Sequence, residues 1–69
     1  AKTLGEVLKQ HRLNCKMTQE FVAETLGVSR QAVSKWESGA SAPGTTNLMA
    51  FAKVFDVSAE ELLKDTQKN

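Results

Sequence analysis

The sequence contains little of what covalent, metal or membrane chemistry requires. Its 69 residues include one cysteine, one histidine, one proline and no tyrosine. Because Cys15 has no partner for an internal disulfide, we expect a reducing compartment, the cytoplasm. No apolar run reaches the length of about 20 residues that a membrane-spanning helix needs. The sequence does not show the basic start followed by an apolar block that would indicate a signal peptide.

The same scarcity argues against metal and catalytic sites. His11 and Cys15 lie four positions apart on or near one helix face, but no further histidine or cysteine can complete four zinc ligands. A site shared between two copies of the chain is the less favoured alternative. Glu60 and Glu61 suit a helix start, where the helix dipole favours acidic residues, better than an acid–base pair. We therefore expect no metal, no cofactor and no enzymatic activity.

Apolar residues recur at helical spacing and predict an all-α fold. The residues from Leu4 to His11 follow an i, i+3, i+4, i+7 pattern, which predicts a first helix over about residues 3–14 with Thr3 as its cap. Gly5 is expected only to weaken this helix slightly. A chain of this length forms one small domain.

Two shorter helices follow, joined by a tight turn. Thr18 is placed to cap the second helix, and Gly27 to end it in a left-handed conformation. Ser29 caps a third helix, over about residues 30–37, only two positions later. The inward face of the second helix is expected to consist of Phe21, Val22, Thr25 and Leu26, with Ala23 beside it.

A loop and two further helices complete the prediction. Pro43 and Gly44 prevent an early restart within a loop over residues 38–46. Either Thr45 or Thr46 is expected to cap the fourth helix.

The last part of the chain carries a second capping signal. Asp56 and Val57 interrupt the fourth helix, and Ser58 opens a capping box for a short fifth helix over about residues 59–64. Residues 65–69 are polar and are expected to fray. The predicted architecture is a compact five-helix bundle, a single domain over residues 1–69 with an ordered core at about 3–64.

Charge is distributed unevenly along the chain. Residues 1–36 hold six basic and three acidic side chains, a net charge of +3, whereas residues 37–69 hold three basic and five acidic ones, a net charge of −2. A basic first half suits a polyanionic partner on one side of the molecule, although ordinary surface scatter gives the same numbers.

The third helix has one polar and one apolar face. At 100° per residue, Arg30, Gln31, Ser34 and Lys35 share one arc, and Val33 and Trp36 point the other way. Glu37 falls on the border of the buried side. A solvated face without any ligand would show the same polar residues. Two helices that meet near a right angle need a small residue at the crossing and a sharp turn, which Ala23 and Gly27 supply.

These features resemble the helix-turn-helix of the lambda-repressor-like family, also called the Cro/CI or Xre family. The resemblance covers about residues 4–63, and the segment SRQAVSKWE is especially close to bacterial members. It depends on Arg12, Met17-Thr18-Gln19, Val22-Ala23, Leu26-Gly27-Val28-Ser29, Val33, Trp36-Glu37, Gly39, Pro43, Leu48, Ala52 and Val57.

The resemblance implies that the third helix enters the DNA major groove and that the second lies near the phosphate backbone. The positions that would read bases are Ser29, Arg30, Gln31, Ser34 and Lys35. The positions that would contact phosphates are Arg12, Lys16, Thr18, Gln19 and Ser38. The chemistry is compatible, because Arg or Lys can donate to guanine and Gln31 can pair with adenine. Gln19 would stand at a helix N-terminus, which favours a phosphate.

The resemblance also implies structural roles. Arg12 and Glu37 match an ion pair that ties the first helix to the third, and Ala23, Gly27, Val33 and Trp36 match interior or turn positions. Three departures stand out. Lys16 replaces a common glycine, His11 replaces a residue that is often apolar, and residues 38–47 contain no lysine or arginine.

The function implied is a sequence-specific double-stranded DNA-binding transcription regulator, with repression favoured, of bacterial or phage type and associated with the nucleoid. Such proteins usually bind two-fold symmetric operators as homodimers, here with an interface expected around residues 57–63. The alternative is a protein-interaction module of antitoxin or adaptor type on the same fold, toward which the loop without basic residues and the modest net charge lean.

Overall fold

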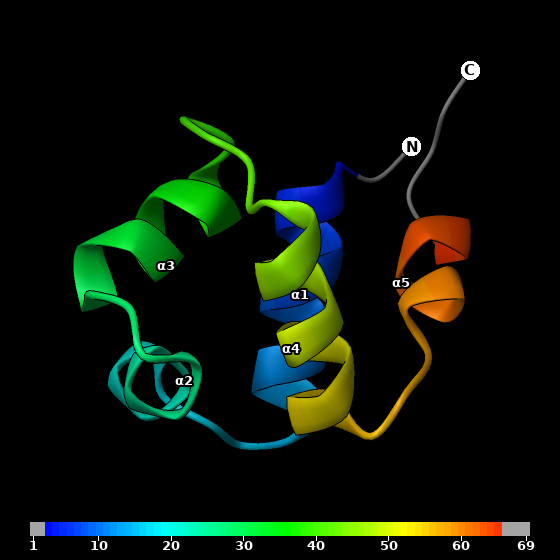
Figure 1. Cartoon of the computed structure of the whole chain (residues 1–69), viewed down its shortest axis with the longest axis horizontal. Coiled ribbons are helices and arrows are strands. Elements are labelled where there is room, and N and C mark those ends of the chain that lie inside the picture. The colour runs from blue at the N-terminus through cyan, green and yellow to red at the C-terminus, as the bar shows by residue number, and fades with distance from the viewer. Residues whose placement is uncertain (1–2, 66–69) are drawn as a thin grey trace.

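The residues that cap the helices determine where most of them begin and end. In the computed structural model, which describes residues 3–65, the elements are α1 (Leu4–Asn14), α2 (Gln19–Leu26), α3 (Arg30–Ser38), α4 (Thr45–Phe55) and α5 (Ala59–Asp65) (Figure 1). The predicted all-α fold with five helices is confirmed. Of the segment expected to fray, residues 66–69 lie outside the described range. No helix within residues 3–65 is long and apolar enough to cross a membrane.

Hydroxyl side chains cap four of the five helices at their N-termini. The predicted capping role of Ser58 is confirmed, because its Oγ accepts a hydrogen bond from the backbone N–H of Glu61 at 3.0 Å at the start of α5. Thr3 and Glu6 form a reciprocal capping box at the start of α1. The Oγ1 of Thr18 accepts a hydrogen bond from the backbone N–H of Phe21 at 3.0 Å, and the Oγ of Ser29 accepts one from the backbone N–H of Ala32 at 3.1 Å. These bonds satisfy N–H groups that have no partner inside the helix.

The predicted cap of α4 is wrong. The capping residue is Gly44, which forms no side-chain bond, and Thr45 and Thr46 both lie inside the first turn. The helix starts earlier because the Gly44 carbonyl already accepts from the N–H of Leu48 at 2.8 Å. The third helix also ends one residue later than predicted, at Ser38, because the chain turns only at the following glycine.

Four helices end in the same backbone motif. The residue after each helix, or one further, has a positive φ angle, and the N–H of the next residue bonds to a carbonyl five positions back. This is the Schellman arrangement, which satisfies carbonyls at a helix end. The positive φ falls on Lys16, Gly27, Gly39 and Asp56, with values of 58°, 76°, 90° and 60°. Two of the four positions are therefore held by residues with a side chain, for which this conformation is less favourable.

The core consists of buried apolar side chains from all five helices. Its members are Val7, Leu8, Val22, Ala23, Val33, Trp36, Phe51, Ala52, Phe55 and Leu62. Aromatic rings run through it: Trp36 meets Phe51 edge-on at 5.7 Å, and the His11 ring stacks on Phe55 at 5.5 Å between centroids. The position that is often apolar in relatives is thus filled here by a stacked imidazole.

The inward face of α2 is narrower than predicted. Val22 and Ala23 are buried and Leu26 packs against the core, but Phe21 and Thr25 are exposed. The Oγ1 of Thr25 donates to the Phe21 carbonyl instead. Of the eight residues of α2, Val22 and Ala23 are buried, so the helix covers the core with a narrow stripe.

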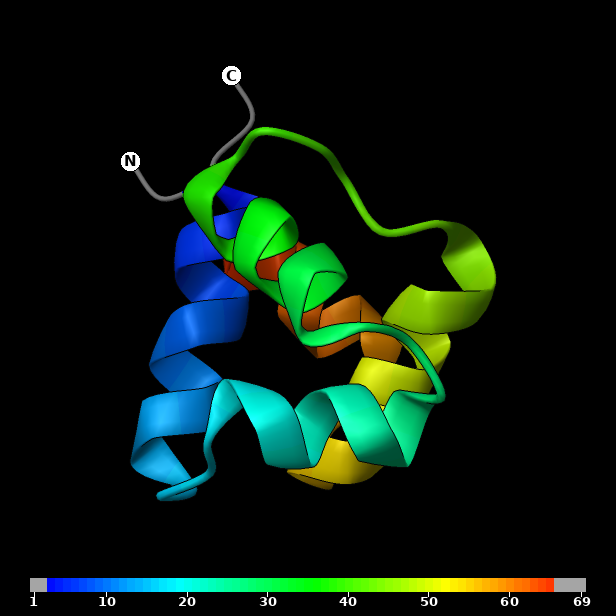
Figure 2. The ribbon, with the colours of Figure 1, turned by 90° about the vertical axis from the view of Figure 1, so that its left-hand side faces the viewer.

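Helices α2 and α3 stand together on one side of the molecule. In Figure 1, α2 is seen end-on while α3 runs across the view, which is the steep crossing expected of a helix-turn-helix. Figure 2 turns both helices toward the viewer, with α1 along one edge and the α3–α4 loop along another. This side carries the candidate site.

Candidate nucleic-acid interface

The polar arc of α3 forms the middle of this side. Arg30, Gln31 and Lys35 are exposed, and Ser34 is half-buried. These four side chains line a shallow depression of about 390 Å³. The structure therefore brings together four of the five residues predicted to read bases. The fifth, Ser29, is exposed next to them, although its oxygen is already the acceptor that caps α3.

A second depression, of about 500 Å³, lies at the start of α2. It is lined by Arg12, Met17, Thr18, Gln19, Glu20 and Arg30. Since Arg30 lines both depressions, they are neighbours, and we call the two together the groove surface. It contains three of the predicted phosphate contacts and places them beside the predicted base contacts.

A partly buried cluster of polar groups adjoins the groove surface, and two of its members, Arg12 and Gln19, also line that surface. We call it the buried cluster because its central carboxylate, that of Glu37, is buried. Arg12 Nε is 2.6 Å from Glu37 Oε2, and Arg12 Nη2 donates to Oε1 at 3.2 Å, a two-pronged ion pair. Gln19 Nε2 donates to the same Oε1 at 3.0 Å. The Glu37 side chain is 4% exposed and that of Arg12 11%. The ion pair implied by the family resemblance is thus formed, and Glu37 is buried rather than at a border.

This cluster joins three helices. Arg12 stands on α1, Gln19 on α2 and Glu37 on α3, and Arg12 Nη1 also donates to the Met17 carbonyl at 2.8 Å in the α1–α2 connection. Because paired, hydrogen-bonded charges are tolerated inside a protein and unpaired ones are not, each member depends on the others. Among the described residues, no buried side-chain nitrogen or oxygen lacks a partner.

The cluster changes how Gln19 must be understood. As a predicted phosphate contact, Gln19 was expected to have a free side-chain amide. In the structure, one of its two amide N–H groups donates to Glu37. The second N–H is what remains for a phosphate. Gln19 can therefore fix the carboxylate and contact a ligand at once.

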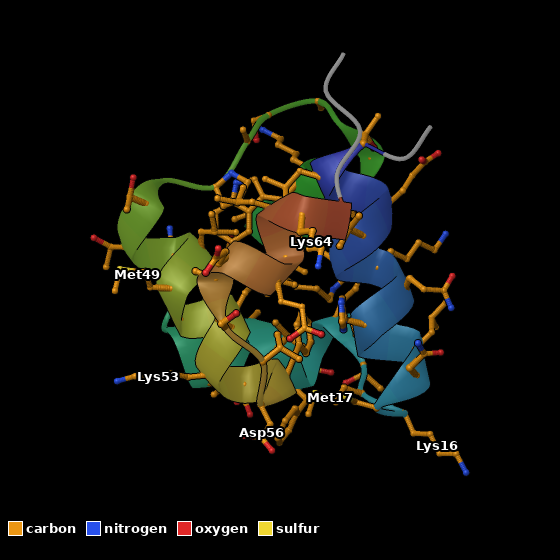
Figure 3. All side chains as sticks on the ribbon, turned by 90° about the vertical axis from the view of Figure 1, so that its right-hand side faces the viewer. Lys16, Met17, Met49, Lys53, Asp56 and Lys64 are labelled. Carbon is orange, nitrogen blue, oxygen red and sulfur yellow. The ribbon has the colours of Figure 1, made fainter. Side chains whose placement is uncertain are left out.

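Two other predicted phosphate contacts differ in their freedom. Lys16 is exposed in the α1–α2 turn, and Figure 3 shows its side chain pointing away from the body of the protein. Ser38 is exposed as well, but its hydroxyl donates to the Lys35 carbonyl at 3.1 Å and accepts from the N–H of Ala40 at 3.4 Å. Ser38 is engaged in ending α3.

The residues predicted to be structural have buried or turn positions. Ala23, Val33 and Trp36 are buried, and Gly27 ends α2 with a φ of 76°. Trp36 lies in the core against Phe51 and is not available as a stacking surface for a base.

Sequence reasoning missed the role of Gly5. A Cβ at this position would lie 2.3 Å from the Trp36 carbonyl oxygen and 2.7 Å from that of Glu37, both backbone atoms of α3. Gly5 is buried at the point where α1 touches the last turn of α3. The one available signal was a glycine beside the apolar stripe of an otherwise well-formed helix, which indicates close packing.

Known proteins share both this sequence pattern and this fold. A family model described as helix-turn-helix matches residues 8–62. The transcriptional activator BcrR of Enterococcus faecalis is 48% identical over 59 residues, which cover 86% of this chain and 29% of BcrR. The transcriptional regulator DicA of Escherichia coli is 41% identical over 61 residues, 88% of this chain and 45% of DicA. The chain therefore spans less than half the length of these curated relatives.

Solved structures agree. The P22 c2 repressor in complex with synthetic operator 9T has a TM-score of 0.85 and 33% identity, covering 93% of this chain and 97% of that one. The biofilm regulator SinR in complex with DNA has a TM-score of 0.81 and 29% identity, covering 88% and 98%. The chain thus belongs to the helix-turn-helix family, as a domain of the lambda-repressor-like type.

Proposed function

We propose that this chain is the DNA-binding domain of a transcription regulator, which reads a double-stranded operator in the major groove with α3. The observation that carries the proposal is the groove surface, which joins the exposed arc of α3 to the N-terminus of α2. The same fold holds a synthetic operator in the P22 c2 repressor complex. The relatives named above are regulators and a repressor, which favours DNA over the alternative of a protein-interaction module.

Each part of the groove surface has a distinct task in this proposal. Arg30, Gln31 and Lys35 read base edges, assisted by the short hydroxyls of Ser29 and Ser34. Phosphate contacts from Arg12, Lys16, Thr18, Gln19 and Ser38 fix the position of the domain on the duplex without reading sequence. The loop between α3 and α4 offers no basic side chain, so positively charged phosphate contacts are concentrated at the α1–α2 side.

We place repression first, because a domain seated in the groove can block a promoter without any second contact. The names of its relatives include both an activator and a repressor. A protein with this function works at the nucleoid.

We also propose that two copies bind a two-fold symmetric operator, since one domain covers about one half-site. Within the stretch predicted for the dimer interface, Leu62 is fully buried and Val57 packs against the core of the same chain, whereas Leu63 is 49% exposed. Leu63 is therefore the apolar residue that this stretch offers to a second copy.

The test begins with selection of duplexes from a random pool by the wild-type chain, with the oligomeric state measured on the same sample. Arg30→Ala and Gln31→Ala are each expected to weaken binding to the enriched duplex by about 5- to 150-fold, the loss of 1–3 kcal/mol per base contact. Binding to a random duplex should weaken much less. Affinity should also fall as salt rises, because phosphate contacts release counterions.

Lys53→Ala is the matched control, since Lys53 is exposed on α4 and lines neither depression (Figure 3). It should leave both affinities unchanged. If Arg30→Ala and Gln31→Ala weakened both duplexes equally, base reading by α3 would be wrong. A flat salt dependence would exclude phosphate-led docking.

A further inference from the structure

Backbone atoms of α3 leave no room for a side chain at Gly5 of α1. At Gly5, the nearest atoms to an added Cβ are the carbonyl oxygens of Trp36 and Glu37, at 2.3 and 2.7 Å. Neither is a side-chain atom, so no rotamer change can make room. Restoring ordinary van der Waals separation requires one helix to move by about 1 Å relative to the other.

The packing of the two helices indicates which of them would move. Helix α1 packs against α3, α4 and α5, and its Val7 and Leu8 are buried in the core. Helix α3 packs mainly against α1 and α2. Because α1 packs against three helices and an added methyl group on it would meet only the last turn of α3, we expect that turn to be pushed outward.

From this contact we infer that Gly5 is a positioning residue, which sets how far the C-terminal half of α3 stands out from the body of the domain. The inference rests on the proposed function, since α3 is the helix assigned to base reading. Binding groups must be held within about 0.5 Å of their working geometry, so a shift of about 1 Å exceeds the tolerance.

The effect should grow along α3. Its N-terminus is tied to α2 by the short turn that contains Gly27, while the pushed atoms belong to its last turn. Displacement is then largest near Lys35, intermediate near Ser34 and smallest at Arg30. A loss of stability alone would weaken all base contacts alike, so this gradient distinguishes positioning from folding.

The same movement would reach the phosphate side of the groove surface. Glu37 would move with the last turn of α3, away from Arg12 and Gln19, which hold its carboxylate. The amide of Gln19 is expected to reorient as a result. Gly5 therefore acts on both halves of the groove surface without touching the duplex.

The experiment compares Gly5→Ala with Gly44→Ala, whose added Cβ meets nothing within 4 Å. Residual dipolar couplings of the free proteins give the orientation of α3 relative to α1, a measurement that needs no DNA. Affinities are then measured for the duplex that the wild type enriches from a random pool and for its single-base variants. The base pairs read by each end of α3 are identified with Lys35→Ala and Arg30→Ala. All variants are also made in a second background that carries Asp56→Gly. This substitution relieves a positive φ angle away from the groove surface and is expected to raise the free energy of unfolding.

We expect α3 to reorient in Gly5→Ala only, and affinity for the enriched duplex to fall by about tenfold, the scale of one lost base contact. Discrimination should be lost at the base pairs that depend on Lys35 and kept at those that depend on Arg30. An unchanged α3 orientation, an equal loss at all base pairs, or a Gly5→Ala chain that does not fold in either background overturns the positioning role. If the wild type enriches no duplex, the proposed function fails and this role fails with it, whereas the other outcomes concern Gly5 alone.

Discussion

Two groups of polar side chains in the helix-turn-helix use the same chemistry in opposite ways. In the buried cluster, an arginine and a glutamine donate hydrogen bonds to a glutamate. On the arc of α3, Arg30, Gln31 and Lys35 are exposed, and among the described residues their side chains have no hydrogen-bond or ion-pair partner. The first group joins helices to each other, and the second is left for a ligand.

The difference shows how a nine-residue helix can separate stability from recognition. Helix α3 directs Glu37 inward to the buried cluster and Arg30 outward to the groove surface. Removing one partner of a buried pair strands the other charge, whereas an exposed charge stays solvated when its neighbours change. Substitutions in the two groups should therefore affect different measurements.

The largest effect is expected from Glu37→Ala. It leaves the Arg12 guanidinium, whose side chain is 11% exposed, without its carboxylate, a loss of about 3–5 kcal/mol in the free energy of unfolding. For a domain of this size that is a large part of the total stability. Urea denaturation followed by circular dichroism measures it. Glu20→Ala, which removes an exposed glutamate from α2, should change the value by less than about 0.5 kcal/mol. A loss below about 1 kcal/mol for Glu37→Ala would mean that the cluster does not brace the fold.

A smaller effect is expected when the two glutamines, Gln19 in the buried cluster and Gln31 on the arc of α3, are compared. Gln19→Ala removes a hydrogen bond to a carboxylate and should lower the free energy of unfolding by about 1–2 kcal/mol. Gln31→Ala removes an exposed side chain and should leave it unchanged within about 0.5 kcal/mol. The two variants should also differ in binding. Gln31→Ala should reduce affinity for the enriched duplex only, whereas Gln19→Ala should reduce affinity for enriched and random duplexes alike. The division of tasks is wrong if Gln31→Ala lowers the free energy of unfolding as much as Gln19→Ala does, or if Gln19→Ala weakens binding to the enriched duplex alone.

The smallest effect is expected in the α1–α2 turn, where Lys16 combines both tasks. Its φ of 58° is unfavourable for a residue with a side chain, so Lys16→Gly should raise the free energy of unfolding by about 0.5–1 kcal/mol. The same change removes a proposed phosphate contact and should make the negative slope of log affinity against log salt shallower by about 0.9. Thermal unfolding and salt titration measure the two effects.

Asp56→Gly is the control for Lys16→Gly, because it relieves a φ of 60° at the end of α4 and should stabilise the fold without changing the salt slope. Should Lys16→Gly leave the slope at its wild-type value, Lys16 contacts no phosphate.

Much of the fold could be predicted because its signals are local. Thr18, Ser29 and Gly27 mark helix boundaries through bonds to backbone a few residues away, and these predictions agree with the structure. The cap of α4 was wrong because Gly44 offers no side-chain signal. Phe21 and Thr25 were placed inward because a periodic pattern shows that a helix has an apolar face, but not how wide a stripe its neighbours cover.

The candidate site divides in the same way. The exposed arc of α3 follows from helical spacing, and the ion pair between Arg12 and Glu37 was available only through the family resemblance. Neither source indicated that Gln19 holds Glu37 or that Gly5 meets α3, because both contacts join residues 18 or more positions apart.

The sequence alone determined the helices, all of their N-terminal caps except that of α4, and the separation of α3 into a polar and an apolar face, because these depend on neighbours within four residues along the chain. The tertiary structure decided which polar groups are already used and which remain for DNA. That choice depends on how three helices converge on the buried carboxylate of Glu37 and on how closely the backbone at Gly5 lets α3 approach α1.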